Sequence, residues 1–224
     1  MSELNLPSLG TRQNVREQVA EALRASLVAG EMRPGVVYSA PALAERFGIS
    51  PTPVREAMLD LAKEGLVTAV RNKGFRVTEL SDRDLDEITE VRALIEVPTV
   101  ARIAASPEGA EELRPLAEAI VTAAERRDIL GYIEADHTFH LELLALAGNA
   151  HLVGVVRELR HRSRLYGVPS LAERGELLPS AREHLQLLDF VTGGDVQAAE
   201  TLMLHHLRHV RGIWAVPRES SEAC

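Results

Sequence analysis

The sequence predicts a mainly α-helical protein, with an N-terminal winged helix-turn-helix followed by an antiparallel all-helical bundle. Alanine and leucine are plentiful whereas aromatic residues make up only 4% of the chain, which favours helices over sheets. Residues 39–77 combine two short helical patterns with a basic hairpin pattern, and residues 82–215 show helical periodicity without strand alternation. These three observations set the fold class.

Charge and histidine are divided unevenly along the 224 residues. Residues 1–79 hold 10 Lys and Arg against 9 Asp and Glu, whereas residues 80–224 hold 15 against 24. All eight histidines lie at or after His137, and the last lysine is Lys73. This asymmetry predicts two domains with different tasks, residues 1–79 and residues 80–224.

Cysteine use and hydropathy predict a cytoplasmic protein without a membrane partner. The single cysteine, Cys224, is the last residue, so a disulfide framework is excluded. No apolar run approaches the roughly 18 residues of a membrane span, and the N-terminus lacks a signal pattern.

The first regular pattern is an amphipathic helix over residues 13–27, with Val15, Val19, Leu23 and Leu27 at every fourth position. Gly30 ends it, and Pro34 and Gly35 turn the chain.

Two short helices follow, joined by a tight turn. The pattern around Leu43 and Phe47 stops at Gly48, a residue free to take positive φ. Ser50 suits an N-cap and Pro51 the first helical position. The second helix has one apolar face, formed by Val54, Ala57, Met58 and Leu61. Such a pair is typical of a helix-turn-helix and predicts binding to double-stranded DNA.

The second helix carries the residues that we expect to contact DNA first. Arg55 projects from its early turns and is the candidate for a base or phosphate contact. Ser50 and Thr52 suit phosphate contacts near the helix N-terminus. An internal ion pair of Arg55 with Glu56 or Asp60 is the alternative.

A basic hairpin completes the winged motif. The strand patterns Leu66–Val70 and Phe75–Val77 flank the turn Arg71-Asn72-Lys73-Gly74. Lys73, with Arg71 and Arg76 around it, fits a wing that contacts the DNA backbone or minor groove. A solvated basic turn is the simpler interpretation.

Several separated motifs over residues 15–77 resemble the GntR family of bacterial transcription regulators. They read Gly-Glu-Met-Arg-Pro-Gly, Pro-Thr-Pro-Val-Arg-Glu-Ala-Met, Glu-Gly-Leu-Val and Lys-Gly-Phe-Arg-Val, in that order. The resemblance implies a dimer that reads two operator half-sites. At two positions where FadR-like members often carry arginine, this chain has Pro41 and Pro51, whose side chains cannot donate a hydrogen bond to a base. The operator sequence of those relatives therefore cannot be assigned to this chain.

After a linker at 78–81, Ser81 is expected to cap the first helix of the bundle. Helical patterns are expected at about 82–105, 108–127, 129–147, 150–166, 177–192 and 195–215.

Four residues of the bundle could hold a metal ion. Asp136 and His140, four residues apart, share a helix face with apolar neighbours, and His184 and His206 each lie on an apolar face of a later helix. Buried imidazoles and a carboxylate are costly unless paired or metal-bound. From the residues alone, a hydrogen-bonded core group and a metal site both remain open. The ligand types suit Zn²⁺, Ni²⁺, Fe²⁺ or Mn²⁺ and do not rank them.

The bundle resembles the FCD effector domain of FadR-type GntR regulators. The similar segments are Glu-Val-Arg-Ala-Leu-Ile-Glu, Asp-His-Thr-Phe-His, Ala-Gly-Asn-Ala-His-Leu, Glu-His and Gly-Asp-Val-Gln-Ala-Ala-Glu-Thr-Leu-Met-Leu-His-His-Leu. The resemblance implies that Asp136, His140, His184 and His206 bind a divalent metal ion, with Zn²⁺ as the first choice. It also implies that a small carboxylate ligand completes the metal shell.

Arg92, on the first bundle helix, is the candidate clamp for a second carboxylate of that ligand. The alternative is a surface salt bridge with Glu96. His137 and His209 are expected near the metal site but not as ligands.

Together these features predict a transcriptional repressor, a homodimer whose operator affinity is controlled by a small organic acid, and not an enzyme. Two alternatives stay open: a helical-bundle metalloenzyme, and a regulator whose metal is purely structural.

Overall fold

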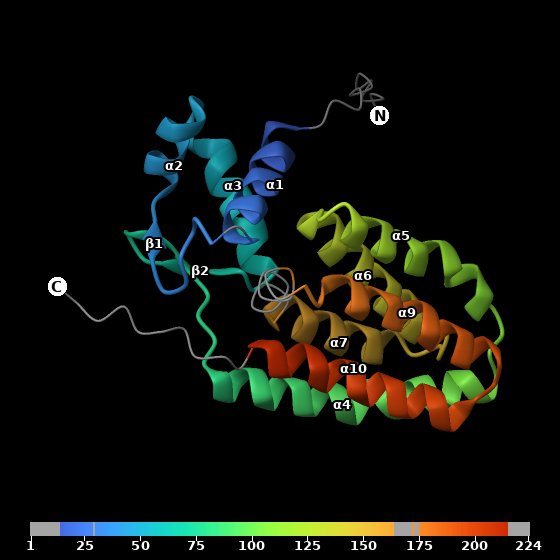
Figure 1. Ribbon diagram of the computed structural model, residues 1–224. Coiled ribbons are helices and arrows are strands. Elements are labelled where there is room, and N and C mark those ends of the chain that lie inside the picture. Colours follow the sequence, from blue (N-terminus) through green and yellow to red (C-terminus); the bar gives the residue numbers. More distant parts are fainter. Residues whose placement is uncertain (1–13, 29, 164–171, 173–174, 215–224) are drawn as a thin grey trace, which may run out of the picture.

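The N-terminal part of the computed structural model is a three-helix unit with a small sheet (Figure 1). The structure describes residues 14–28, 30–163, 172 and 175–214. The elements of this unit are α1 (Val15–Val28), β1 (Val37–Tyr38), α2 (Ala40–Phe47), α3 (Pro51–Lys63), β2 (Val67–Val70) and β3 (Gly74–Val77). The strands form an antiparallel sheet in the order β1-β3-β2.

The helix-turn-helix is built as the sequence predicts. Gly48 ends α2 in the left-handed conformation, with φ of 67°, and Ser50 occupies the extended N-cap position before α3. The Ser50 hydroxyl makes no capping hydrogen bond, which leaves it available to a partner outside the chain. The apolar face of α3 is buried against α1 and α2, so the opposite face is held at the surface.

Strand β1 was not predicted. It is only two residues long and lies between Gly35 and the helix α2, so it shows no alternation that a sequence pattern would reveal. Its pairing partner is distant in sequence: Val37 and Tyr38 lie opposite Arg76 and Phe75 of β3. The strand therefore anchors the wing to the segment before α2.

The C-terminal part is a bundle of helices. Its elements are α4 (Asp82–Ala105), the 3₁₀ helix η1 (Ala110–Leu113), α5 (Arg114–Glu125), α6 (Ile129–Ala145), α7 (Ala150–Ser163), α9 (Leu177–Thr192) and α10 (Val196–Trp214). No strand occurs after Val77 in the described ranges. The predicted fold class, a winged helix-turn-helix followed by a helical bundle, is confirmed. None of the helices in those ranges is long and apolar enough to cross a membrane.

Two boundaries of the bundle have clear local causes. Ser81 and Asp84 form a reciprocal capping box, in which the Ser81 amide donates to the Asp84 carboxylate at 2.8 Å. The single helix expected over 108–127 is divided into η1 and α5 instead. Pro115 lacks an N–H and its ring crowds the preceding turn, so a new helix starts at Arg114.

The two parts have separate hydrophobic cores but touch one another. One core runs from Val19 to Val77 and the other from Val100 to Leu207. Within the bundle, α4 lies alongside α10, and α5 packs against both α6 and α9. Between the parts, α1 contacts α6, and Arg162 of α7 lies close to Gly65.

Candidate metal centre and DNA-binding surface

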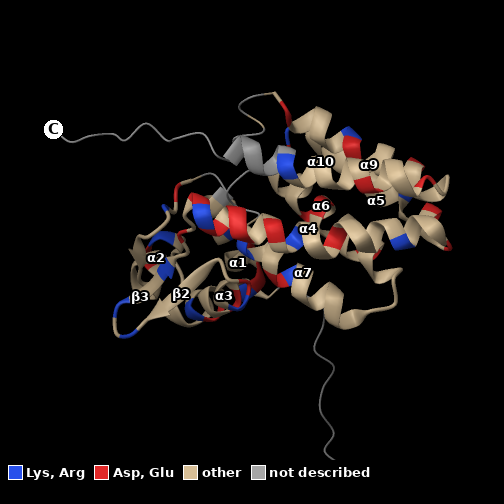
Figure 2. Cartoon of the chain, turned by 90° about the horizontal axis from the view of Figure 1, so that it is seen from below, with Lys and Arg blue, Asp and Glu red and all other residues tan. Residues whose placement is uncertain are grey.

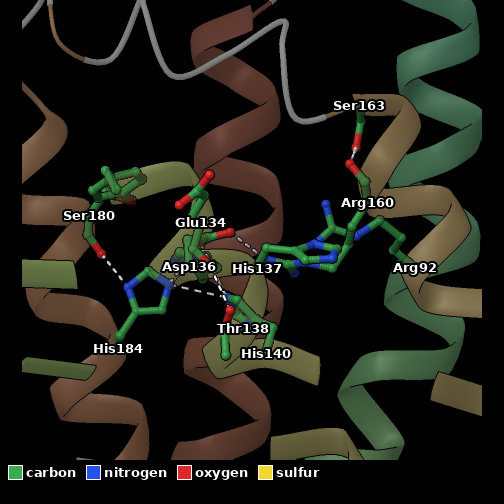
Figure 3. A network of polar contacts seen from close by, with 12 residues as sticks. Arg92, Glu134, Asp136, His137, Thr138, His140, Arg160, Ser163, Ser180 and His184 are labelled. Atoms are coloured by element: carbon green, nitrogen blue, oxygen red, sulfur yellow. Dashed lines mark hydrogen bonds and ion pairs between the residues drawn. The ribbon is translucent and has the colours of Figure 1, made fainter. Parts of the chain in front are cut away.

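The structure brings Asp136, His140, His184 and His206 together inside the bundle. Asp136 and His140 come from α6, His184 from α9 and His206 from α10. One potential ligand atom from each residue lies within 4.8 Å of all the others. The three imidazoles are buried, and Asp136 is partly buried. Figure 3 shows His184 pointing toward Asp136 and His140.

The spacing of these atoms fits a single divalent ion. Nε2 of His184 lies 3.1 Å from Nε2 of His140 and 3.1 Å from Oδ1 of Asp136, and the His140–Asp136 distance is 3.6 Å. Ligands about 2.1 Å from a central ion stand roughly 3.0–4.2 Å apart. The three distances among Asp136, His140 and His184 lie within this range, and the ligand atom of His206 lies within 4.8 Å of each of the other three.

The neighbours of two imidazoles orient them as metal ligands require. Nδ1 of His184 lies 3.1 Å from the carbonyl oxygen of Ser180, and Nδ1 of His206 lies 2.6 Å from Oε2 of Glu183. When Nδ1 donates to a carbonyl or a carboxylate, Nε2 carries a free lone pair. Metal-binding histidines almost always have such a partner on the other nitrogen.

The protonation states also suit metal binding. Burial lowers the pKa of His140 well below its usual value, and the Arg160 guanidinium adds to this effect. Burial also lowers the pKa of His206, although the hydrogen bond with Glu183 opposes it. Burial alone would raise the pKa of Asp136, but the Arg160 guanidinium holds that pKa well below its usual value. Neutral imidazoles next to an ionised carboxylate make a ligand set ready for a cation.

A buried network of four charged side chains connects this cluster to α4. Nη2 of Arg160 donates to Oδ2 of Asp136 at 2.6 Å, and its Nη1 lies 3.3 Å from Oε2 of Glu96. Nε of Arg92 in turn donates to Oε1 of Glu96 at 2.6 Å. Arg92, Glu96 and Arg160 are all less than 10% exposed. Two guanidinium groups and two carboxylates therefore share one low-dielectric site. Figure 3 labels Arg92, Asp136 and Arg160 of this network.

Arg92 makes the i, i+4 ion pair that was the alternative to its role as a clamp, although the pair is buried and not at the surface. Arg160 was not predicted at all. Its position in the helical repeat could have revealed it, because Arg160 lies on the same buried face of α7 as Val153 and Val156. Of the other two expected neighbours, His137 contacts His161 of α7. The side chain of His209 lies outside the described residues.

Glu183 provides a first test of the cluster. Replacing Glu183 by glutamine is expected to lower the affinity for a divalent metal by about 10- to 100-fold, because the His206 ring loses the carboxylate that orients it and raises its basicity. A competition titration against a chromogenic chelator measures the change. Glu142→Gln, at an exposed position of α6, is the matched control. Equal affinities of the two variants would argue against the assignment.

The six residues predicted to contact DNA are all exposed: Ser50, Thr52, Arg55, Arg71, Lys73 and Arg76. The structure brings three of them together, since Arg55 of α3 and Arg71 and Lys73 of the wing line one surface depression. Figure 2 shows the basic tip of the β2–β3 turn beside the helices of this unit. Ser50, Thr52 and Arg76 lie outside the depression.

The proposed internal ion pair of Arg55 does not form. Asp60 is engaged by Arg16 at 2.5 Å and by Lys63 at 3.0 Å. Within the described part of the chain, no ion pair joins Arg55 to Glu56 or to Asp60. The guanidinium of Arg55 therefore faces solvent beside the wing, where a nucleic-acid backbone or base edge can reach it.

Comparisons with known proteins agree with this two-part organisation. Residues 15–77 match the family model of bacterial regulatory proteins of the gntR family, and residues 87–209 match the FCD domain. The probable D-xylose utilization operon transcriptional repressor of Paenarthrobacter nicotinovorans is 31% identical over 200 residues, covering 88% of this chain and 87% of that protein. The transcriptional repressor RspR of Escherichia coli K12 is 27% identical, covering 96% and 95% of the two chains.

Among solved structures, McbR/YncC of E. coli superposes with a TM-score of 0.69 at 26% sequence identity. The match covers 91% of this chain and 98% of that one. The family models, the similar sequences and the similar structure therefore all indicate a regulator of the gntR family with an FCD domain.

Proposed function

The chain belongs to the GntR family of bacterial regulatory proteins and carries an FCD domain, and we propose that this DNA-binding transcriptional regulator is a repressor controlled by a small organic acid. The acid binds at a metal ion held in the bundle. The observation that carries the proposal is the buried Asp/His₃ cluster. The family and the relatives are transcriptional regulators, so the alternative of a metalloenzyme is set aside.

In this proposal Asp136, His140, His184 and His206 hold the ion, with Zn²⁺ first and Ni²⁺, Fe²⁺ or Mn²⁺ as alternatives. When bound, the ion supplies open coordination positions to which an acid's carboxylate binds. The carboxylate of Asp136 offsets one positive charge of the ion, and the ion pair with Arg160 holds that carboxylate in place. An acid with a second carboxylate would compete with Glu96 for the Arg92 guanidinium, which assigns Arg92 to effector binding.

We place the domain boundary between residues 79 and 80, in the segment without regular structure between β3 and α4. The N-terminal domain binds operator DNA through Ser50, Thr52, Arg55, Arg71, Lys73 and Arg76. The protein acts in the cytoplasm as a homodimer, because two half-sites need two recognition helices at a fixed separation. An acid changes operator affinity only if it binds two states of the dimer with different affinities.

Arg55 tests the DNA-binding surface. Arg55→Ala is expected to weaken operator binding by about 1–3 kcal/mol, or roughly 5- to 150-fold, because a guanidinium contact to a base or phosphate is lost. Fluorescence anisotropy with a selected operator duplex measures it. Arg46→Ala, which removes an exposed arginine of α2 outside the depression, should bind within about twofold of the original protein. An Arg55→Ala variant with undiminished affinity would remove Arg55 from the interface.

The proposed function as a whole is tested by titrating metal-loaded protein with selected duplexes in the presence of C3–C6 organic acids. One acid is expected to change operator affinity about tenfold or more, a coupling of ~1.4 kcal/mol. The variant His184→Ala/His206→Ala should lose this response, and His151→Ala, at an exposed position of α7, should keep it.

Other outcomes decide between the alternatives. If the metal-loaded protein binds DNA but no acid changes its affinity, and metal removal melts the bundle, then the metal is structural. The duplexes are selected by the protein from a library of short DNA sequences. If the protein selects no duplex from this library, repression through an operator is excluded.

A further inference from the structure

Helix α3 exposes one large apolar side chain, Leu59, on the face that carries the predicted DNA contacts. Leu59 is 43% exposed. It follows Thr52 by seven residues and Arg55 by four, so the three side chains share one face of the helix. The buried residues of α3 occupy the opposite face. Leu59 is not among the residues of the core of the N-terminal unit, so its apolar surface does not serve the packing of that unit.

Leu59 lines the same depression as Arg55, at the place where α2, α3 and the β2–β3 hairpin meet. Three residues of this depression are basic, namely Arg55, Arg71 and Lys73, and none of the described residues that line it is acidic. The other large group, which we call the apolar patch, consists of Ala40, Pro41, Leu59, Ala69, Val70 and Phe75. The depression therefore suits a ligand that carries negative charge and also presents an apolar group.

Double-stranded DNA presents both. Its phosphates can pair with the basic side chains, and the C5-methyl group of thymine is the apolar group that the major groove offers at the base edges. An apolar protein segment fits less well, because it would cover three cationic side chains without supplying a negative charge. The chemistry of the depression therefore favours a DNA site that contains thymine.

The position of Leu59 on the helix also suits a base contact. Four residues separate it from Arg55, which is about 6 Å along the helix axis, and successive base pairs are about 3.4 Å apart. Leu59 is therefore expected to lie opposite a base pair within about two steps of the one that Arg55 reaches.

We propose that Leu59 is a specificity-determining residue that contacts the C5-methyl group of one thymine in each operator half-site. The side chains of the apolar patch carry no hydrogen-bond donor, so this part of the surface selects a base by apolar contact and shape. Arg55 selects by charge and hydrogen bonding, and the two residues thus read different features of neighbouring base pairs. This role of Leu59 rests on the proposed DNA-binding surface and adds the identity of one base to it.

The first experiment removes the methyl group from the DNA. In a duplex selected by the original protein, each thymine of a half-site is replaced singly by uracil, which keeps its pairing with adenine and lacks only the methyl group. Fluorescence anisotropy measures the affinities. One replacement is expected to weaken binding about three- to fivefold, the effect of one buried methyl group. At the same position, 5-methylcytosine paired with guanine should bind more tightly than cytosine by a similar factor.

The second experiment removes the side chain. Leu59→Ala should bind the thymine duplex about three- to tenfold more weakly, and it should bind the thymine and uracil duplexes equally well. Val36→Ala, at a position 42% exposed that does not line the depression, is the control and should keep the preference for thymine. Both side chains are exposed, so neither change should unfold the protein, and circular dichroism checks this.

The outcomes separate this role from DNA binding itself. If uracil is bound as well as thymine at every position, if the selected half-sites share no thymine, or if Leu59→Ala still prefers thymine, then the role of Leu59 is wrong and DNA binding stands. If the protein selects no duplex at all, both the role of Leu59 and the proposed DNA-binding surface are wrong.

Discussion

The His184→Ala/His206→Ala variant is expected to lose divalent metal binding, with an affinity lower by at least about a thousandfold. Losing one residue that merely orients a ligand costs about 10- to 100-fold in metal affinity, and this variant removes two of the four ligands themselves. Asp136 and His140 remain on α6, four residues apart. Two ligands on one helix cannot join α6 to α9 and α10, so the link that the ion makes between three helices is lost.

Metal content after equilibrium dialysis and a chelator competition measure this loss, first with Zn²⁺ and then with Ni²⁺, Fe²⁺ and Mn²⁺. His151→Ala removes an exposed histidine of α7 and should bind metal like the original protein. A double variant that keeps one tightly bound ion per chain would show that the ion sits elsewhere. Circular dichroism of both variants shows whether the helices are retained. If they are, the lost metal binding is due to the missing ligands and not to unfolding.

The positions of the four cluster residues could be predicted because helical periodicity assigns each side chain to a face. Asp136, His140, His184 and His206 were each expected to point inward, and all four do. Periodicity does not tell which inward faces meet, because that depends on how the helices are arranged. The sequence resemblance supplied that arrangement, and the structure has it.

Arg160 was missed for a related reason. Helix α7 reads as amphipathic with a basic last turn, and basic residues near a helix C-terminus normally interact with the dipole in water. Its partners Glu96 and Asp136 lie 64 and 24 residues away, so no local spacing signals the contact. The sequence does place Arg160 on the same face of α7 as the apolar residues Val153 and Val156. A charged residue on a buried helix face needs a buried partner of opposite charge.

The fold was predictable where local rules decide. Gly48, Ser81 and the α3 face followed from turn, cap and periodicity rules. β1 and the division of 108–127 were not predicted, because the first depends on pairing with β3 and the second on one proline inside an otherwise helical pattern. Non-local pairing and single breaks are the features that pattern reasoning resolves least.

Glu96→Ala is expected to lower the free energy of unfolding by about 3–5 kcal/mol, the cost of leaving buried charges without their partner. Glu96 is 0% exposed and lies between Arg92 and Arg160, which are themselves buried. After the substitution, the Arg92 guanidinium loses the carboxylate that it pairs with, and Arg160 keeps its ion pair with Asp136. In a chain of this size the melting temperature should fall by roughly 2–4 °C for each kcal/mol lost.

Chemical denaturation of the metal-free protein measures the effect. Glu111→Ala is the matched control, because it breaks another Arg–Glu pair of the bundle that lies at the surface. It should change the unfolding free energy by less than about 1 kcal/mol. If the unfolding free energy falls by a similar amount in both variants, the buried network does not stabilise the fold more than the surface ion pair does.

Replacing the charged residues of the Arg92–Glu96–Arg160 network by apolar ones separates its effect on protein stability from its effect on metal binding. Arg92→Met/Glu96→Leu/Arg160→Met removes the three members of the network that are less than 10% exposed and leaves Asp136, which is 23% exposed, without Arg160. Replacing buried charges together by apolar side chains is often neutral or stabilising. The Arg160 guanidinium holds the pKa of Asp136 low, so the triple variant should bind metal more weakly even if it folds as well. A variant that is stable but poor in metal would mean that the network is kept to hold Asp136 ionised and aimed at the ion. A variant that is equally good at both would leave the network without a role in metal binding.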